Sequence, residues 1–384
     1  MRVLTCFFVF FILIINYGCT HRNQGQKDSV RSNAFKELPI KYAKGFTIRK
    51  VNNSFLLSVQ NPWQGARNIV YRYLLVPRGE KVPEGIDDVQ IIRTPVKKII
   101  CMSTTYIAMI DLLGETETIK GISGSSLVNN KQVRKMLKNG AIRDVGYDQG
   151  LNFEEIIGLN PDLLMTYGVS GNHISSVHKL ENSGVKVVYN AEYLENTPLG
   201  KAEWIKFIGA FYGKEEIAAS YFDSIADLYN NLKELTSSVK EKPVVLTGLP
   251  WKESWYVPGG KSFMANFIKD AGGNYLWRDD DSRESFPLDL EAVFNKGMQT
   301  DVWINTGSAG SLKEIADVDD RLTNLGPFRK MEIYNNNARL NQFGGNDYWE
   351  SGVIKPHIIL KDLIKIFHPE LLSDHQFYFY KKLD

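Results

Sequence analysis

The longest stretch of the chain with a helical repeat of apolar positions spans residues 197–239. Thr197 followed by Pro198 is typical of an N-cap and a first-turn proline, and Gly213 is expected to end a first helix. Beyond it, apolar residues recur three and four positions apart, namely Ile217, Ala218, Tyr221, Phe222, Ile225, Leu228, Tyr229, Leu232 and Leu235. This pattern predicts a second helix over residues 214–239, roughly 35 Å long, which could bridge two lobes. Taken alone, the same pattern would equally fit a core helix of one large domain.

The segments on either side of this stretch resemble each other. Residues 152–168 predict an acid-capped helix, an aspartate and a buried strand that ends in glycine, and residues 289–307 repeat this order. The strand, loop, helix and glycine of residues 99–114 recur in residues 244–273. Strands that alternate with helices indicate parallel α/β layers, and ligands of such sheets sit beyond the carboxyl ends of the strands. We therefore expect a ligand cleft between two α/β lobes, residues 93–213 and 240–384.

Residues 33–92 have a different, β-rich pattern. Three short segments of alternating or β-branched residues are separated by turns that contain asparagine, proline and glycine, and they lie at residues 46–51, 55–59 and 69–76. The predicted fold class is therefore α/β, with two Rossmann-like lobes joined by a long α-helix and a small N-terminal β-meander extension.

The N-terminus has the features of a secretion signal. Arg2 precedes an apolar run over residues 3–15, which is too short for a membrane span and ends shortly before Cys19. Gly18 directly before Cys19 resembles the lipobox of bacterial lipoproteins, in which the cysteine carries lipid. We expect a signal peptide over residues 1–18 and a polar, lipid-anchored tether over residues 19–32. Because Asn16 and Tyr17 fit the lipobox poorly, a plain signal peptide is the alternative.

Cysteine usage agrees with export, because Cys6 would leave with the signal, Cys19 would carry lipid, and Cys101 would have no disulfide partner. An acidic cluster after Cys19 would favour the cell surface, and its absence favours the periplasm.

Charge and motifs argue against several function classes. The net charge of +2 over 384 residues offers no basis for nucleic-acid binding. The segment 121–124 lacks the glycine spacing of a hydrolase nucleophile elbow, and the segment 255–262 lacks the first glycine of a phosphate-binding loop. His173 and His178 are not on one helical face, so no zinc site is predicted. The sequence predicts neither an enzyme nor a cofactor or metal site.

Three segments in order resemble a known family. They are residues 100–114, residues 145–163 and the loop Asn346-Asp347-Tyr348-Trp349-Glu350, with the predicted bridging helix between the second and third. They are similar to the periplasmic binding proteins, of the class III helix-linked type, that serve ABC importers of iron-siderophore, haem and cobalamin. The resemblance covers roughly residues 93–370, and the β-rich extension has no counterpart in it.

The resemblance implies a ligand between the lobes, and aromatic side chains near the strand ends would suit a flat macrocycle or chelate. The ligand-binding candidates are Thr104, Thr105, Tyr106, Tyr147, Asp148 and Tyr167 in the first lobe and Trp251, Trp255, Tyr256 and Tyr348 in the second. Aromatic residues could equally be core residues, and for Trp303 we expect a core position. Thr104 and Thr105 could offer a helix N-terminus to an anionic group or could simply cap the helix.

The resemblance also implies one glutamate on each lobe that meets arginines of the membrane permease. Asn152-Phe153-Glu154 and Tyr348-Trp349-Glu350 match the contexts of these glutamates. Glu154 is also explained as a first-turn acid that the helix dipole favours, and Glu155 could take its docking role.

We therefore expect a lipid-anchored, monomeric binding protein that captures an iron chelate, either a siderophore complex or haem, and delivers it to an ABC permease in the inner membrane. Cobalamin is the alternative ligand within the family. A secreted adhesin or structural lipoprotein is the alternative from another class, followed by a periplasmic hydrolase. A stiff helical bridge implies a small closure on binding.

Overall fold

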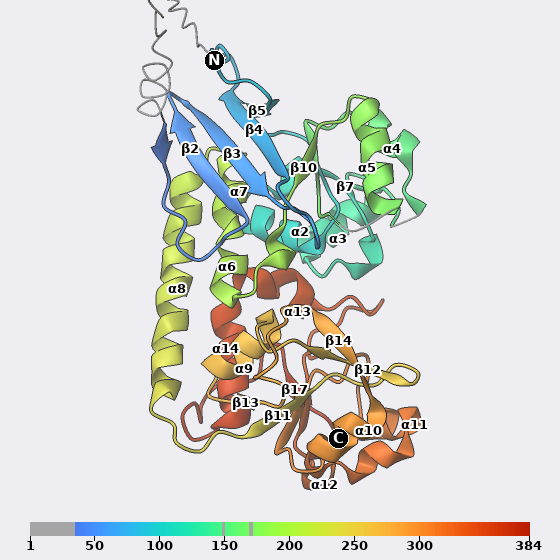
Figure 1. Cartoon of the computed structure of the whole chain (residues 1–384). Coiled ribbons are helices and arrows are strands. Elements are labelled where there is room, and N and C mark those ends of the chain that lie inside the picture. The colour runs from blue at the N-terminus through green and yellow to red at the C-terminus, as the bar shows by residue number, and fades with distance from the viewer. Residues whose placement is uncertain (1–34, 148–149, 169–171) are drawn as a thin grey trace, which may run out of the picture.

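The computed structural model describes residues 35–147, 150–168 and 172–384, so the predicted signal peptide, the tether and Cys19 lie outside it. Two parallel β-sheets form two lobes, and the helix α8 (Glu215–Ser237) runs along one side of both (Figure 1). Within the described ranges, no helix combines the length and the apolar character that crossing a membrane requires.

The first lobe is built on five parallel strands in the order β10-β9-β6-β7-β8. These strands are β6 (Ile99–Cys101), β7 (Ile119–Ile122), β8 (Arg143–Asp144), β9 (Leu163–Thr166) and β10 (Val187–Tyr189). The helices of this lobe are α2 (Thr104–Leu112), α3 (Lys131–Lys138), α4 (Phe153–Gly158) and α5 (Asn172–Asn182), with short 3-10 turns at η1 (Thr116–Thr118), η2 (Ser125–Leu127) and η4 (Glu192–Leu194). Every residue of β6, β9 and β10 is buried, as expected for parallel strands covered on both faces.

The second lobe has a similar sheet in the order β13-β11-β15-β16-β17, in which only the last strand is antiparallel. Its strands are β11 (Val244–Thr247), β13 (Asn274–Tyr275), β15 (Val302–Ile304), β16 (Ile333–Asn335) and β17 (Lys381–Lys382). Its helices are α9 (Phe263–Asp270), α10 (Leu290–Gly297), α11 (Leu312–Val318), α12 (Gly326–Lys330), α13 (Asp347–Glu350) and α14 (Pro356–Phe367), with 3-10 turns η5 (Asp320–Asn324) and η6 (Ser351–Ile354).

The second lobe also contains a two-stranded ribbon that the sequence pattern did not predict. Strand β12 (Ser254–Pro258) pairs antiparallel with β14 (Ser285–Asp289). Strand β12 lies between β11 and α9, where a plain loop was expected, and β14 lies just before α10. The two lobes therefore share an order of strands and helices but differ in the segments that connect them.

The bridging helix α8 follows two short helices, α6 (Pro198–Ala202) and α7 (Trp204–Ala210). Ahead of it, Lys214 donates from Nζ to the carbonyl of Leu113 in the first lobe at 2.6 Å. Further along, the Tyr229 hydroxyl donates to Asp270 of α9 at 2.8 Å, in the second lobe. The helix thus contacts both lobes, and its buried stripe, which includes Ala218, Phe222, Ile225 and Tyr229, follows the three- and four-residue spacing of the sequence.

The N-terminal extension forms a sheet of its own, in the order β1-β2-β3-β4-β5. Its strands are β1 (Lys36–Glu37), β2 (Phe46–Val51), β3 (Ser54–Gln60), β4 (Val70–Pro77) and β5 (Gln90–Thr94). Strand β5 runs parallel to β4 and past the predicted boundary at residue 92, so the extension is more than a meander.

The extension packs against the first lobe beside β10 (Figure 1). The backbone N–H of Tyr189 donates to the Tyr73 hydroxyl at 2.9 Å, and the side chain of Gln90 donates to the carbonyl of Val187 at 2.9 Å. The ring of Phe46 packs against that of Trp204 within the same hydrophobic core, with ring centroids 4.6 Å apart. The extension is therefore an integral part of the first lobe.

Candidate functional site between the lobes

The carboxyl ends of both sheets face a shared boundary. Asn341, which follows β16, donates from its side-chain amide to the carbonyls of Ser126 and Val128, which follow β7, at 2.9 and 2.8 Å. Elsewhere along the boundary, Asn266 of α9 donates to the carbonyl of Asn196, beyond β10, at 3.0 Å. Ligands of parallel sheets bind beyond these strand ends, so the boundary is the place to look for a binding site.

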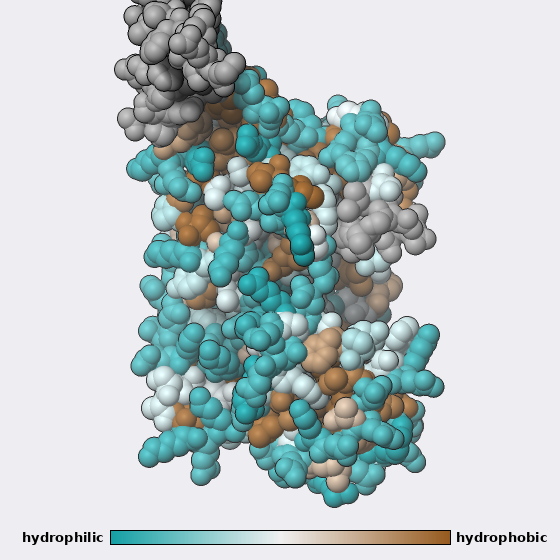
Figure 2. Space-filling view, in the orientation of Figure 1, coloured by the Kyte–Doolittle hydropathy of each residue, from teal (hydrophilic) through white to brown (hydrophobic). Residues whose placement is uncertain are grey.

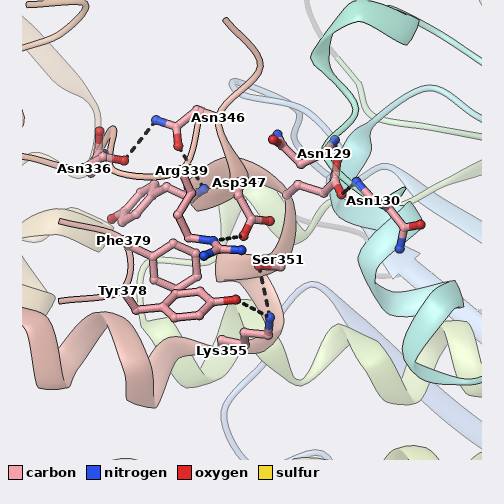
Figure 3. Close-up of polar contacts among 12 residues, drawn as sticks. Asn129, Asn130, Asn336, Arg339, Asn346, Asp347, Ser351, Lys355, Tyr378 and Phe379 are labelled. Carbon is pink, nitrogen blue, oxygen red and sulfur yellow. Dashed lines mark hydrogen bonds and ion pairs between the residues drawn. The ribbon is translucent and has the colours of Figure 1, made fainter. Parts of the chain in front are cut away.

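A cavity of about 590 Å³ lies on this boundary, between helices α2 and α3 of the first lobe and residues 338–355 of the second. Its charged lining residues are Asp111, Lys131, Arg339, Asp347, Glu350 and Lys355. Figure 3 shows Arg339 beside Asp347, with Nε 2.8 Å from Oδ2, and Lys355 between Ser351 and Tyr378, 3.3 Å from each oxygen. The cavity therefore offers a ligand both charged groups and apolar surface, the latter from residues such as Leu112, Leu340 and Ile354.

Glu350 is one of the two predicted docking glutamates, and the structure places it inside the boundary. Its side chain is 2% exposed. Its two carboxylate oxygens accept from the backbone N–H groups of Asn129 and Asn130, both at 2.7 Å, at the start of α3. Burial raises the pKa of Glu350 to about 7. The prediction of an accessible handle on the rim is wrong for Glu350 in this structure, because the carboxylate is already engaged across the lobes.

Glu154 has a different environment. It lies exposed in the first turn of α4, whose N-cap is Asn152. Its neighbour Glu155 is held by Arg143, with Nε 3.0 Å from Oε1. The two explanations of Glu154, a dipole-favoured acid and a docking residue, are both compatible with this position.

Three predicted ligand residues are core residues instead. Tyr106 is fully buried in α2 and donates from its hydroxyl to the carbonyl of Asn190 at 3.2 Å. Trp255 is fully buried in β12 and donates from its indole N–H to the carbonyl of Thr247 at 3.0 Å. Tyr348 is 3% exposed and is surrounded edge-on by the rings of Trp349, Phe379 and Tyr380. The prediction that these three contact ligand is wrong in this conformation.

Strand alternation explains the error at Trp255. The sequence predicts a loop here, but the residues form a strand, in which successive side chains point to opposite faces. Trp255 therefore faces Trp303 in the core, at 5.6 Å, while its neighbour Tyr256 is 51% exposed. The core position expected for Trp303 is confirmed, because its side chain is fully buried.

Three predicted aromatic residues are exposed. Tyr147 follows β8 and is 55% exposed, while Trp251 follows β11 and is 64% exposed. Tyr256, in the middle of β12, is the third. Asp148 lies outside the described residues. In Figure 2, apolar residues appear in separate patches among hydrophilic ones, including around the part of the second lobe where Figure 1 places β12 and β14.

Thr104, Thr105 and Tyr167 are partly buried at the ends of β6 and β9. The N-cap of α2 is Ser103, and the hydroxyl of Thr105 donates to Glu192 at 2.8 Å. Thr105 is thus occupied by a protein carboxylate rather than open to an anionic ligand group.

A group of residues beyond β10 was not predicted from the sequence. Glu192 is 4% exposed, and Lys201 lies 3.5 Å from its second oxygen while Nζ stands 4.7 Å over the ring of Phe263 in α9. Tyr193 stands edge-on to Tyr167, with ring centroids 6.3 Å apart. The position of these residues directly after a buried strand was the signal that could have identified them.

Two α/β lobes joined by one long helix, with a cavity at the boundary between them, define the architecture of helix-linked binding proteins. The sequence matches the periplasmic binding protein family over residues 99–326, and the chain belongs to this family. Its members are solute-binding proteins rather than enzymes, in agreement with the sequence-based prediction.

Solved structures show the same fold at low identity. A periplasmic binding protein from Veillonella parvula aligns with a TM-score of 0.59 and 11% identity over 83% of this chain and 99% of its own. A periplasmic heme binding protein from Pseudomonas aeruginosa aligns with a TM-score of 0.55 and 16% identity, covering 72% of this chain and 94% of its own. A structure described as an ABC-type Fe3+-hydroxamate transport system, from Saccharomonospora viridis, aligns with a TM-score of 0.53 and 18% identity. The alignment covers 71% of this chain and 94% of that structure.

Two relatives come from Methanocaldococcus jannaschii, and both are described as uncharacterized lipoproteins. One is 27% identical over 366 residues, which cover 89% of this chain and 85% of the relative. The other is 26% identical over 329 residues, which cover 82% of this chain and 81% of the relative.

Proposed function

We propose that this protein is a lipid-anchored substrate-binding component of an ABC importer. It captures a metal chelate, either an iron-siderophore complex or haem, between its lobes and delivers it to the permease in the cytoplasmic membrane. Family membership supports the binding role, and two structures with the same fold carry descriptions that name heme and Fe3+-hydroxamate. Cobalamin is the alternative ligand.

The observation that carries this proposal is that both lobes have exposed aromatic rings in segments that follow strands of their central sheets. Tyr147 follows β8 of the first sheet, Trp251 follows β11 of the second, and Tyr256 lies in β12. Large apolar rings that remain exposed in a folded protein are available to a partner, and flat chelates present complementary area.

The anchor is proposed to be a lipid on Cys19, which would hold the folded body outside the cytoplasmic membrane, in the periplasm where the cell has one. The two lipoprotein relatives support this placement. Replacing Cys19 with serine should release the protein from the membrane fraction, and continued membrane association would show that the anchor lies elsewhere.

The ligand is identified by spectroscopy. Protein purified from its native host should carry a haem, ferric-catecholate, ferric-hydroxamate or corrinoid absorption band. The same ligand, titrated into the stripped protein, should quench its tryptophan fluorescence at equimolar ratio. A corrinoid band would assign the protein to cobalamin instead.

Variants test the aromatic contacts. Trp251→Ala and Tyr256→Ala should each weaken binding by about 1 to 3 kcal/mol without loss of unfolding free energy, because both rings are exposed. Trp255→Ala serves as the contrast, since removing a buried tryptophan should cost about 3 to 5 kcal/mol of stability. Unchanged affinity in both exposed variants would refute the aromatic cleft.

A further inference from the structure

The N-terminal extension reaches the boundary between the lobes. Its loop 61–67, between β3 and β4, packs on Gly168 at the carboxyl end of β9. A Cβ added at Gly168 would lie 2.8 Å from the carbonyl oxygen of Pro62 and 2.8 Å from Cβ of Trp63. Distances this short leave no room for a side chain, so the loop and the strand end are in direct contact. The part of the chain that matches the family begins at residue 99, so this loop lies outside the matched part.

Tyr193 joins this loop to the strand end. Its hydroxyl donates to the carbonyl of Gly168 and shares a hydrogen bond with the backbone of Gln64. Burial of the hydroxyl raises the pKa of Tyr193 to about 12, so the group stays protonated and able to donate at physiological pH. The ring itself is 36% exposed and stands edge-on to Tyr167.

Three aromatic residues therefore gather at the carboxyl end of β9. We name them the rim cluster, and they are Trp63, Tyr167 and Tyr193. Trp63 is anchored by the rings of Tyr71 and Tyr189, at 6.2 and 5.8 Å. All three members are partly exposed. The cluster sits where ligands of parallel sheets bind, beside the end of β9.

We propose that the rim cluster is an additional wall of the ligand cleft, which the extension builds and which selects chelates with aromatic surfaces, such as ferric catecholates or haem. This inference rests on the proposed function. Edge-on and stacked aromatic contacts favour planar π-systems over aliphatic chelators such as hydroxamates. Tyr193 is the specificity-determining residue, and the loop 61–67 is the positioning element.

The test measures the affinity of stripped, full-length mature protein for four probes: a ferric tris-catecholate, haemin, a ferric tris-hydroxamate and cyanocobalamin. Tyr193→Ala should weaken binding of the catecholate or haemin about tenfold or more and change hydroxamate binding less than twofold. Leu228→Ala, at an exposed position of α8, is the matched control and should leave every affinity unchanged.

Tyr193→Phe separates contact from positioning. It keeps the ring but removes the bonds to Gly168 and Gln64, so hydrogen exchange in loop 61–67 should accelerate while the affinity falls less than in Tyr193→Ala. A uniform loss of affinity for all probes, or no loss for any, would overturn the inference. Binding of the hydroxamate or cyanocobalamin alone would also overturn it and would leave the binding function intact. Failure of the unmodified protein to bind any of the four would count against the proposed function itself.

Discussion

At the scale of single residues, buried carboxylates tie distant backbone segments to the lobes. Glu203 is fully buried and accepts from the backbone N–H groups of residues 41–43 at 2.6 to 3.1 Å. Asp362 of α14 does the same for residues 378–380 at 2.7 to 3.2 Å, and Glu350 does so for Asn129 and Asn130. Charge-assisted bonds of this kind are about twice as strong as neutral ones, and they offset part of the cost of burying the charge.

Glu203 offers a direct test of this role. Glu203→Gln removes the charge that faces the backbone groups and also leaves the ammonium of Lys206, 2.9 Å away, without a counter-charge. We expect a loss of about 3 kcal/mol in the free energy of unfolding, because breaking a buried pair leaves an uncompensated charge. Urea denaturation measures this loss. Glu216→Gln, at an exposed position, is the control and should stay within about 0.5 kcal/mol of the parent. Equal stability of the two variants would show that Glu203 is not an anchor.

The buried carboxyl group of Glu350 should make the contact between the two lobes depend on pH. Burial raises its pKa to about 7, and Asp347 and Asp111 nearby add to the shift, while Lys131, Arg339 and Lys355 also line the cavity. If the lobes separate, Glu350 becomes hydrated and its pKa falls toward the ordinary value of about 4.5. The form with joined lobes therefore binds the proton of Glu350 more tightly than the separated form. The free energy that favours the joined form is greatest below the ordinary pKa and declines as the pH rises to 7.

Hydrogen exchange at the amides of Asn129 and Asn130 reports on this contact. After correction for the intrinsic rate, protection should decrease from pH 5 to pH 7 in the parent protein and vary much less in Glu350→Gln, which cannot ionise. Glu154→Gln is the control and should behave like the parent. A parent profile that matches that of Glu350→Gln would refute the assignment of the titration to Glu350.

At the scale of elements, close helix packing positions the bridge. Helices α7 and α8 approach each other at Gly209, where an added Cβ would lie 2.7 Å from Cβ of Ala218. The backbone of Gly209 also accepts from Lys214, in the turn between the two helices, at 3.0 Å. A residue without a side chain is therefore required at this crossing, and the angle at which α8 leaves the first lobe depends on it.

Gly209→Val should force α7 and α8 apart. Overpacking a filled interior costs about 1 to 3 kcal/mol, and we expect at least this loss in thermal or urea unfolding. Gly158→Ala, where an added Cβ meets nothing within 4 Å, is the control and should be neutral or slightly stabilising. Retention of full stability in Gly209→Val would show that the two helices can move apart without cost.

At the scale of the whole molecule, each lobe was expected to present a docking glutamate, but only Glu154 is exposed. A permease of two-fold symmetry would then meet two unequal surfaces. Exposed acidic groups act mainly on the rate and salt dependence of association, whereas buried ones act on stability.

Glu154→Ala is therefore expected to leave the affinity for free ligand unchanged and to lower uptake in vesicles that contain the permease. The difference from the parent protein should be largest at low salt and shrink as salt rises, since salt screens the attraction that Glu154 supplies in the parent. Glu155→Ala, which breaks the pair with Arg143 instead, tests whether the neighbour shares the role. Normal uptake in both variants would refute docking through α4, and loss of ligand binding in Glu154→Ala would place Glu154 in the ligand site instead.

The sequence by itself determined the main strands and helices of the two lobes and their order, although not the ribbon of β12 and β14. The three- and four-residue spacing of α8 and the largely apolar runs of β6, β9 and β10 are local patterns, and each element needs only its own residues to set its period. The repeat of these patterns on both sides of α8 was sufficient to predict two α/β lobes and a boundary at their strand ends.

Only the tertiary structure decided which side chains remain accessible at that boundary. Trp255 and Tyr256 are neighbours in the sequence, yet one is core and the other exposed, because the face of β12 that is covered depends on β15 and its Trp303. Glu350 is buried by a segment 220 residues earlier in the chain. The extension, which no local pattern linked to a lobe, meets the end of β9 through Gly168. Burial depends on which surfaces of distant elements meet, and the period of a single segment carries no information about its partner.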